Sequence, residues 1–257
     1  MKTRLRFFIT LITLFIIANT SFAETPDEPK DKILEPGFRL LLLGPYGGVN
    51  FNSHRGQFRT TDGNYLCCEF NEGKGIGLVA GIKAFIPITE ALHVVPRLAY
   101  ESFSGEFTEQ INDIPMRGAG NQLEYWNVEE KLKVTLNVFN VDVLGAYTLT
   151  SFGLYIAAGP AAHFTMKKEF KTTETILGPP GVRYLDGSTT KEFLKQETAV
   201  RDMLFSLRGG VGALIPLTQS IYINPEALYS FPLTTVSKEG EWKASAIQAT
   251  LGILFLL

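Results

Sequence analysis

The stretch Trp242–Leu257, WKASAIQATLGILFLL, decides the fold because its side chains alternate in character along the chain. One set of alternate positions is almost entirely apolar: Ser245, Ile247, Ala249, Leu251, Ile253, Phe255 and Leu257. The positions between them are polar or small, with Leu254 as the exception. A period of two is typical of a β-strand with one apolar face. The stretch is also long enough for a tilted strand to cross a bilayer, which takes ~9–11 residues, so we predict a membrane-spanning strand.

Seven further segments upstream show the same alternation. They are Phe38–Asn52, Ile76–Pro87, Leu92–Phe103, Lys131–Tyr147, Gly153–Met166, Met203–Pro216 and Ile221–Phe231. The phase changes within the fourth segment, where the apolar set from Leu132 to Val138 gives way to an opposite set that includes Val141, Val143 and Tyr147. A β-bulge near Phe139 and Asn140 would reconcile the two halves. The sequence therefore predicts eight strands, with an irregularity in the fourth.

The connections between these segments alternate in length. Those expected to be long loops are Ser53–Lys74, Ser104–Glu124 and Lys167–Arg201, whereas Ile88–Ala91, Thr148–Phe152 and Leu217–Ser220 are short. This asymmetry predicts an all-β fold, an eight-stranded antiparallel up-and-down transmembrane β-barrel with short periplasmic turns and long extracellular loops. A soluble lipocalin-like barrel is the alternative, but its connections would not alternate so regularly in length.

The first 23 residues have the features of a secretory signal peptide. A basic start is followed by the apolar run Phe7–Ile17 and by the small residues Ser21 and Ala23 at the expected cleavage site. The charged, proline-bearing segment 24–37 is then a periplasmic leader, and the barrel domain occupies 38–257. Such a chain is expected to be exported to the outer membrane.

Composition excludes several classes of protein. Removal of the signal peptide takes away three basic residues and leaves 21 Lys and Arg against 26 Asp and Glu, a net charge of −5 that argues against a nucleic-acid partner. No later stretch holds the ~18 consecutive apolar residues of a membrane helix. The only cysteines, Cys67 and Cys68, are adjacent. A strained vicinal disulfide and two free thiols both remain open for an exported protein, whereas no nearby His or further Cys suggests a metal site.

Charged residues lie on the polar face of several predicted strands. By the alternation, Lys83, Arg97, Glu101, Asp142, Arg208 and Glu226 point into the barrel near the middle of their strands. An eight-stranded barrel is only wide enough inside to be filled by side chains. Because an isolated buried charge is very costly, charges of both signs on one enclosed face must meet. We therefore predict a polar plug, an internal ion-pair network with Tyr46, Asn224 and Gln248 at its edges.

Candidates for chemistry are few. A hydrolase at the lipid boundary would need a nucleophile beside a histidine. His54 is expected in a loop and His93 at the periplasmic end, which leaves His163, near Thr165, as the best candidate. A single inward histidine is usually only hydrogen-bonded, so a non-enzymatic protein without cofactor is predicted. The glycine-rich runs Gly73–Gly77 and Gly209–Gly212 match no phosphate-binding fingerprint, and we interpret their small residues as room for Tyr46 and Tyr155.

Four short motifs carry a family resemblance: Gly47–Phe51 (GGVNF), Gly77–Gly81 (GLVAG), Asn224–Tyr229 (NPEALY) and Gly252–Phe255 (GILF). Together they resemble the OmpA-type and PorT-like outer-membrane β-barrel domain of Gram-negative bacteria. The last stretch resembles the terminal strand that closes such barrels and serves as their assembly signal, although Leu257 stands where an aromatic residue is usual.

The resemblance implies outer-membrane lipid and the barrel assembly machinery as partners, the latter through the final strand. We expect a structural or surface-interaction role through the extracellular loops, with other envelope proteins as further partners. The PorT-like branch implies the alternative of a component of a protein-secretion or envelope-assembly apparatus. A narrow channel and a lipid-modifying enzyme are the remaining alternatives.

Overall fold

The computed structural model describes residues 41–62, 65–117, 122–184, 186–193, 199–238 and 240–257. The predicted signal peptide and leader, 1–37, lie outside the described residues. In the described part of the chain, no helix is long and apolar enough to cross a membrane. The described elements are all strands: β1 (Leu42–Asp62), β2 (Tyr65–Pro87), β3 (Leu92–Arg117), β4 (Leu123–Thr148), β5 (Leu154–Gly178), β6 (Thr190–Phe193), β7 (Met203–Ala213), β8 (Ile215–Pro216), β9 (Ile221–Pro232) and β10 (Lys243–Leu256).

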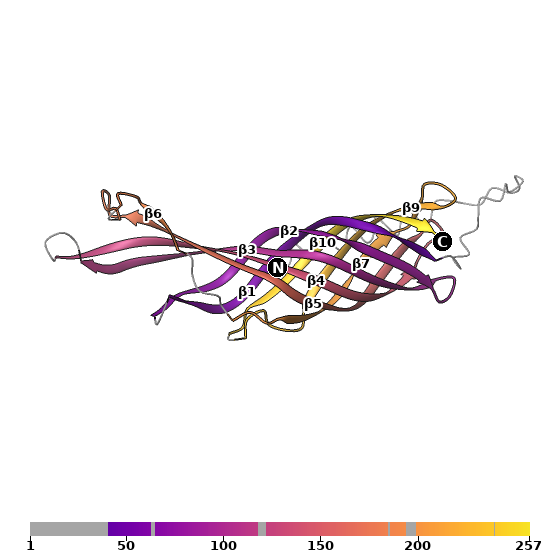
Figure 1. Cartoon of the computed structure of the whole chain (residues 1–257), viewed down its shortest axis with the longest axis horizontal. Helices are drawn as coiled ribbons and strands as arrows, with labels where there is room; N and C mark the ends of the chain where they lie inside the picture. Colours follow the sequence, from indigo (N-terminus) through magenta and orange to yellow (C-terminus); the bar gives the residue numbers. More distant parts are fainter. Residues whose placement is uncertain (1–40, 63–64, 118–121, 185, 194–198, 239) are drawn as a thin grey trace, which may run out of the picture. The chain divides into compact units, whose positions relative to one another are not determined.

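Eight of these strands form a closed antiparallel ring. Their order is β1-β2-β3-β4-β5-β7-β9-β10, and β10 pairs with both β9 and β1. In Figure 1, β10 is the yellow strand that closes the ring between β1 and β9. The short β6 and β8 only extend the edges of β5 and β9. The predicted eight-stranded antiparallel barrel is therefore confirmed, and β7 with β8 covers the sixth predicted segment.

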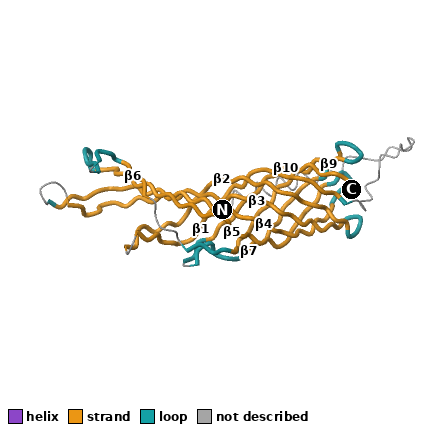
Figure 2. The backbone as a smooth tube through the Cα atoms, viewed as in Figure 1, coloured by secondary structure: helices purple, strands orange, loops and turns teal. Residues whose placement is uncertain are grey.

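Two of the three segments that we expected to be long loops, Ser53–Lys74 and Ser104–Glu124, are instead largely strand, and the third, Lys167–Arg201, is strand in part. β1 and β2 stay paired as far as Asp62 and Tyr65, and β3 and β4 as far as Arg117 and Leu123. β5 continues to Gly178 and β6 pairs with it, so paired strands make up much of the end of the molecule that lies opposite the short connections (Figure 2). The loop prediction was wrong because polarity on the outward face was interpreted as loop, although paired strands above a membrane satisfy their backbone polar groups just as well. We call this the hairpin end, and the opposite one, with the short connections, the turn end.

The outer wall carries an apolar band that begins at the turn end. On β4, alternate outward residues are the exposed apolar Tyr147, Val143 and Phe139, after which the outward positions become polar. The band on β10 runs from Phe255 to Ile247, a length that fits the ~9–11 residues of a membrane-crossing strand. Above the band the outward face is charged, with Lys133 and Lys131 exposed on β4. The band therefore marks the part of the wall that faces lipid.

The inward face changes character at the same level. All even-numbered residues of β4 from Val128 to Ala146 are buried, so the same face points inward throughout. These residues are polar or small at Asn140 and Asp142 but apolar from Val138 to Leu132. The predicted bulge near Phe139 and Asn140 is therefore wrong. The register of β4 with β3 is continuous there, and the irregularity falls between β4 and β5, where Met166 is the extra residue.

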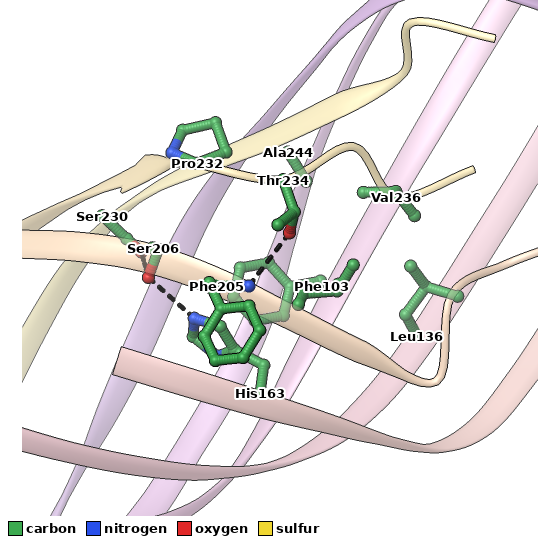
Figure 3. A pocket seen from close by; sticks show the side chains of 11 residues that line it. Phe103, Leu136, His163, Phe205, Ser206, Ser230, Pro232, Thr234, Val236 and Ala244 are labelled. Atoms are coloured by element: carbon green, nitrogen blue, oxygen red, sulfur yellow. Dashed lines mark hydrogen bonds between the residues drawn. The ribbon is translucent and has the colours of Figure 1, made fainter. Parts of the chain in front are cut away.

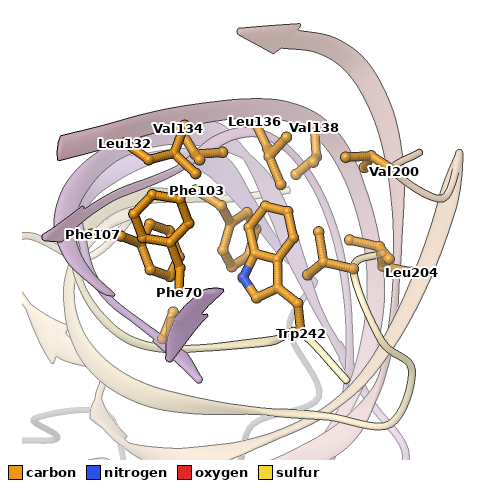
Figure 4. Packing of buried hydrophobic residues seen from close by; sticks show 12 residues of the cluster. Phe70, Phe103, Phe107, Leu132, Val134, Leu136, Val138, Val200, Leu204 and Trp242 are labelled. Carbon is orange, nitrogen blue, oxygen red and sulfur yellow. The ribbon is translucent and has the colours of Figure 1, made fainter. Parts of the chain in front are cut away.

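The interior consists of three layers. Near the turn end lies an apolar cluster that includes Phe85, Leu144 and Leu254. The middle is charged. At the hairpin end lies a second apolar cluster, which we call the Trp242 cluster: Phe70, Phe103, Phe107, Leu132, Val134, Leu136, Val138, Val200, Leu204, Val236, Trp242 and Ala246. Figure 4 shows Trp242 among the rings and aliphatic side chains of this cluster. The expectation of a wholly polar plug is thus corrected, because polar groups fill only the middle layer.

Candidate functional site

The middle layer brings all six predicted charged residues together. Each is at most 6% exposed, and together they contribute three positive and three negative charges: Lys83, Arg97, Arg208, Glu101, Asp142 and Glu226. They come from β2, β3, β4, β7 and β9, and each lies on the inward face of its strand because the outward face must be apolar at this level. The layer is therefore neutral as a whole, which is the condition under which such burial is tolerable.

Arg208 holds one half of the layer together. Its Nη1 and Nη2 atoms donate to Glu101 Oε1 and Oε2 at 2.9 and 2.6 Å, an arrangement in which both guanidinium branches engage one carboxylate. Nη1 also donates to Asp142 Oδ2 at 2.7 Å. Asn140 donates to the same oxygen at 2.9 Å. Such two-pronged pairing of Arg with carboxylate is the strongest type of charge-assisted hydrogen bond, so it fixes β7 against β3 and β4.

Arg97 and Lys83 hold the other half. Arg97 Nη1 lies 2.5 Å from Glu226 Oε1, and its Nε lies 3.3 Å from Asp142 Oδ1. Lys83 Nζ lies 3.4 Å from Glu226 Oε2. Both cations also lie over the ring of Tyr46, at 4.9 Å for Lys83 and 4.7 Å for Arg97. Because Asp142 contacts both arginines, the two halves form one continuous network.

The three edge residues that we predicted each contact the network. Gln248 accepts a hydrogen bond from Arg97 Nη2 at 2.5 Å and donates to Glu101 Oε1 at 3.2 Å. Asn224 donates to the hydroxyl of Tyr155 at 2.9 Å, and Tyr155 in turn donates to Glu226 at 2.7 Å. Tyr46 accepts from Arg97 at 3.2 and 3.3 Å. Tyr155 is a member that charge patterns alone could not identify.

Glycine creates the space for one of these large side chains. A Cβ atom at Gly212 would lie 2.3 Å from the hydroxyl oxygen of Tyr155, so no larger residue fits there without displacing the tyrosine. This agrees with the interpretation of the run as room for Tyr155. Tyr46 is instead near Gly252, where a Cβ would lie 3.5 Å from the Cβ of the tyrosine. Gly105 and Gly73 play the same part at the hairpin end, where a Cβ would collide with the rings of His54 and Phe107.

His163 is hydrogen-bonded within the wall, next to a small cavity (Figure 3). Its Nε2 lies 2.8 Å from Ser206 Oγ, which also accepts a hydrogen bond from Ser230 at 3.0 Å. Its Nδ1 lies 3.9 Å from Glu101 Oε2. A serine, a histidine and a carboxylate thus follow one another in the order used by serine hydrolases. However, Ser206 is 4% exposed, Glu101 is engaged by Arg208, and the cavity measures about 20 Å³, enough for about one water molecule.

The Trp242 cluster closes the hairpin end of the barrel, and sequence reasoning missed it. Trp242 Nε1 donates to His54 Nδ1 at 3.1 Å, and His54 Nε2 donates to the carbonyl of Ser104 at 3.0 Å. His54, which we expected in a loop, is a fully buried residue of β1. It lies level with exposed Arg55, above the apolar band, and its burial lowers its pKa to about 4. The signal was present in the apolar inward set of β4, which we interpreted as a register change.

The cysteine pair lies on a strand, at the hairpin end of the molecule. Cys67 and Cys68 lie in β2 and not in a loop, but their side chains are outside the described part of the structure. Among the described residues, no group of three or more His, Cys, Asp or Glu side chains could hold a metal ion.

The chain is similar to solved outer-membrane proteins only at low sequence identity. No curated protein matches the chain. Among solved structures, Ail of Yersinia pestis, crystallised with a heparin analogue, is 10% identical, with a TM-score of 0.30 over 84% of this chain and 99% of that one. The outer membrane protease OmpT from Escherichia coli is 9% identical, with a TM-score of 0.36 over 91% and 99%. The translocator domain of NalP from Neisseria meningitidis is 10% identical, with a TM-score of 0.27 over 99% and 97%.

Sequence identities and TM-scores this low do not assign an activity to the chain. The family is shown by the sequence itself. The sequence model of the family "Outer membrane protein beta-barrel domain" matches residues 22–238. This span includes most of the ring and all six charged residues of its middle layer. The chain therefore belongs to the outer membrane protein β-barrel domain family, and its place is the outer membrane.

Proposed function

We propose that this protein is a closed, non-enzymatic outer-membrane barrel that acts by binding at its hairpin end, which faces the cell exterior. The observation that carries the proposal is the contrast between the interior and the hairpins. Three layers of buried side chains fill the barrel, whereas β3, β4 and β5 continue far beyond the apolar band. A filled interior supports an attachment role better than a transport role.

The hairpin end has the features of a binding surface. Among the described residues, β2 makes no pair with β3 above Gly73–Phe107, where β3, β4, β5 and β6 continue as a sheet of their own. This sheet exposes large side chains at its tip, including Leu123, Tyr125 and Leu177 at 60, 57 and 52%. Exposed aromatic and apolar side chains on a protein surface are typical of interaction sites.

The sheet is also ordered by contacts at its base and along its length. The hydroxyl of Tyr184, from the segment after β5, donates to Glu174 Oε1 at 2.6 Å. Lys168 lies 2.9 Å from Asp202, and this hydrogen bond lowers the pKa of the Asp202 carboxyl. An ordered surface loses less conformational entropy on binding than a flexible loop, which supports a binding role.

Photocrosslinking in living cells tests the proposal. A photoreactive amino acid at Tyr125 is expected to give discrete protein adducts, because this side chain is exposed at the tip. The matched position is Tyr147, which is exposed in the apolar band near the turn end and should contact lipid. Lipid adducts at Tyr147 would show that the photoreaction works. If they formed while Tyr125 gave no protein adducts, a binding role at the hairpin end would be contradicted.

Three further measurements separate the other roles that the family resemblance implies. Planar-bilayer recordings of the purified protein should show no conductance steps, because the charged layer is buried between two apolar ones. A changed set of secreted proteins in a deletion strain would support a PorT-like secretion component instead. Altered lipid A in the mass spectra of that strain would support a lipid-modifying enzyme.

A further inference from the structure

One edge of β3 has no partner strand among the described residues of the hairpin end. Its pairing with β2 stops at Gly73–Phe107, whereas its pairing with β4 continues to the end of β3. β2 turns inward there, because Phe70 is buried in the Trp242 cluster with its ring 5.9 Å from that of Phe107 (Figure 4). In Figure 1 the hairpin of β1 and β2 ends apart from that of β3 and β4. The edge of β3 is therefore open from Thr108 onward.

The backbone groups at this edge can be assigned from the register. A Cβ atom at Gly75 of β2 would lie 2.3 Å from the carbonyl oxygen of Ser104, so this carbonyl points to the β2 side of β3. Successive residues of a strand direct their N–H and C=O groups to opposite neighbours, and the register of β3 with β4 is regular up to residue 111. The residues that present one N–H and one C=O each to the open edge are therefore Thr108, Gln110 and Asn112.

The tip of β3 is protected against pairing, but this part of the edge is not. The register with β4 shifts between Ile111 and Ile114, and Asp113 has a positive φ of 58°. Pro115 follows and has no backbone N–H. Bulges and prolines are among the features that keep edge strands from pairing with other chains. The regular and unblocked part of the edge is therefore the segment Thr108–Asn112.

A row of carboxylates ends at the same edge. Glu109 of β3 lies directly opposite Glu130 of β4, which lies directly opposite Glu174 of β5. Like charges that face each other across strands destabilise a sheet unless a cation compensates them. At one end of the row this cation is Lys191 of β6, which lies directly opposite Glu174. Glu109 is at the other end and forms no ion pair with another described residue, so the row lacks a cation at the open edge.

The next row on the same face of the sheet is apolar. Ile111 of β3 lies opposite Val128 of β4, and Val128 lies opposite Ile176 of β5. Val128 and Ile176 are only 4% and 8% exposed, whereas Ile111, at the edge, is half-buried. An apolar side chain placed beside Ile111 would remove its remaining surface from water.

We propose that the open edge of β3 binds an extended segment of another protein, which adds to the sheet as an antiparallel strand. The segment carries a basic residue opposite Glu109 and an apolar residue opposite Ile111, so it reads apolar, any residue, basic. This inference rests on the proposed binding role of the hairpin end and names the class of partner. In such strand addition the backbone hydrogen bonds provide affinity, and the alternate side chains provide specificity.

The geometry of the edge suits this partner. Because the backbone groups of Glu109 point to β4, the residue opposite it belongs to a non-hydrogen-bonded pair, in which the two side chains lie closest together. A lysine or arginine at that place would complete the carboxylate row. A second copy of this chain does not fit, because its own edge would add another row of carboxylates instead of a cation.

Peptide binding to the purified full-length protein in detergent micelles tests the proposal, with fluorescence anisotropy as the readout. The probe is the labelled, capped peptide Ser-Thr-Val-Thr-Lys-Thr-Ser, whose Val and Lys are spaced to lie opposite Ile111 and Glu109. The wild type is expected to bind it on the order of tenfold more tightly than the same peptide with Glu in place of Lys. N-methylation of the central Thr, which removes the N–H that would bond the carbonyl of Gln110, should cost a similar factor.

Two substitutions of one residue separate backbone pairing from side-chain contacts. Gln110→Pro removes an N–H from the open edge, a change that edge strands tolerate, and should weaken peptide binding about tenfold. Gln110→Thr loses the same side chain but keeps the N–H, so it should bind as the wild type does. Glu109→Lys should reverse the preference, so that the peptide with Glu binds more tightly. Gel mobility before and after boiling verifies that each variant is folded.

Several results would overturn the proposal. They are equal binding of the Lys and Glu peptides by the wild type, and equal losses in Gln110→Pro and Gln110→Thr. A wild-type dimer that Gln110→Pro abolishes would overturn it as well, because the edge would then serve a second copy. Photocrosslinking at Tyr125 distinguishes these failures from that of the proposed function. Protein adducts there without peptide binding would overturn the strand addition alone, whereas the absence of both would overturn both.

Discussion

The charged layer and the Trp242 cluster occupy the same barrel interior, yet they are opposite in character. The charged layer is level with outward residues such as Val143, which face lipid. The Trp242 cluster is level with outward residues such as Lys133, which face water. Within the lipid the apolar side chains must point outward, and the polar ones are left to fill the interior. Above the lipid the ordinary rule for soluble proteins applies, so apolar side chains point inward. The level at which the pattern inverts therefore marks the membrane boundary.

The largest expected effect comes from breaking the charged layer. Arg208→Leu leaves Glu101 and Asp142 buried without their main partner, which should cost about 3–5 kcal/mol of unfolding free energy. Urea unfolding in detergent micelles, followed by the shift in gel mobility, measures the loss. Arg201→Leu, an exposed position, is the control and should change little.

A compensating substitution sharpens that result. Arg208→Leu combined with Glu101→Leu removes one charge of each sign, so it should be less destabilising than Arg208→Leu alone. An Arg208→Leu protein with the wild-type urea midpoint would contradict the view that the layer acts as a balanced network.

The Trp242 cluster should respond as a protein core does. Leu136→Ala removes fully buried apolar volume and should cost about 2–5 kcal/mol. Val141→Ala, on the opposite face of the same strand and below the inversion, should cost much less, because lipid can fill the space. Equal losses in urea unfolding for the two variants would contradict the assignment of inside and outside on β4.

A charge placed on the outer wall locates the boundary directly. Val143→Lys introduces a cation into the middle of the apolar band on β4 and should cost about 2–4 kcal/mol in lipid vesicles. Thr135→Lys, above the inversion on the same face, should cost close to nothing. If both variants were equally stable in vesicles, the band would not be the lipid-facing surface.

Acid should lower the free energy of unfolding, because His54 in the Trp242 cluster is buried in its neutral form. The loss should be small near neutral pH. The pKa of His54 is about 4 in the folded protein, below its ordinary value of 6.5, because burial disfavours the charged ring. The folded state therefore binds fewer protons, so its stability is complete above pH 6.5 and falls as the pH drops towards 4. The loss should be on the order of 1 kcal/mol at pH 6. Urea unfolding at pH 8 and pH 6 measures it, and a His54→Gln variant should lose part of the dependence.

Much of the band region could be predicted from sequence, because the period of two is strict where one face meets lipid. The eight strands, their antiparallel order and the inward direction of residues such as Arg97 and Glu226 all follow from it. The contacts within the layer could not be predicted, because they depend on which distant strands become neighbours. Tyr155, for example, reaches Glu226 over a sequence separation of 71 residues.

The region above the band was predicted less well. We applied the rule for lipid-facing strands, in which apolar side chains point outward, to the parts of the strands that stand in water as well. The apolar set from Leu132 to Val138 was assigned to a shifted outward face, although it continues the inward face of β4. The polar outward residues of the same region were interpreted as loop. His54 and Trp242 gave no pattern of their own, since each is a single inward residue whose partner lies 188 positions away.

The charged layer also has a consequence for how the barrel is assembled. It draws on every strand of the ring, through Tyr46, Lys83, Arg97, Asp142, Tyr155, Arg208, Glu226 and Gln248 in chain order. Its pairs join distant parts of the chain, and Gln248 of β10 reaches back to Arg97 across 151 residues. Because β10 supplies Gln248 and closes the ring between β1 and β9, we expect the charges to lose their last water only when the ring closes. A strand that slipped by one residue would turn its charge towards lipid. The complete network of ion pairs therefore forms only in a barrel whose strands pair in the correct register.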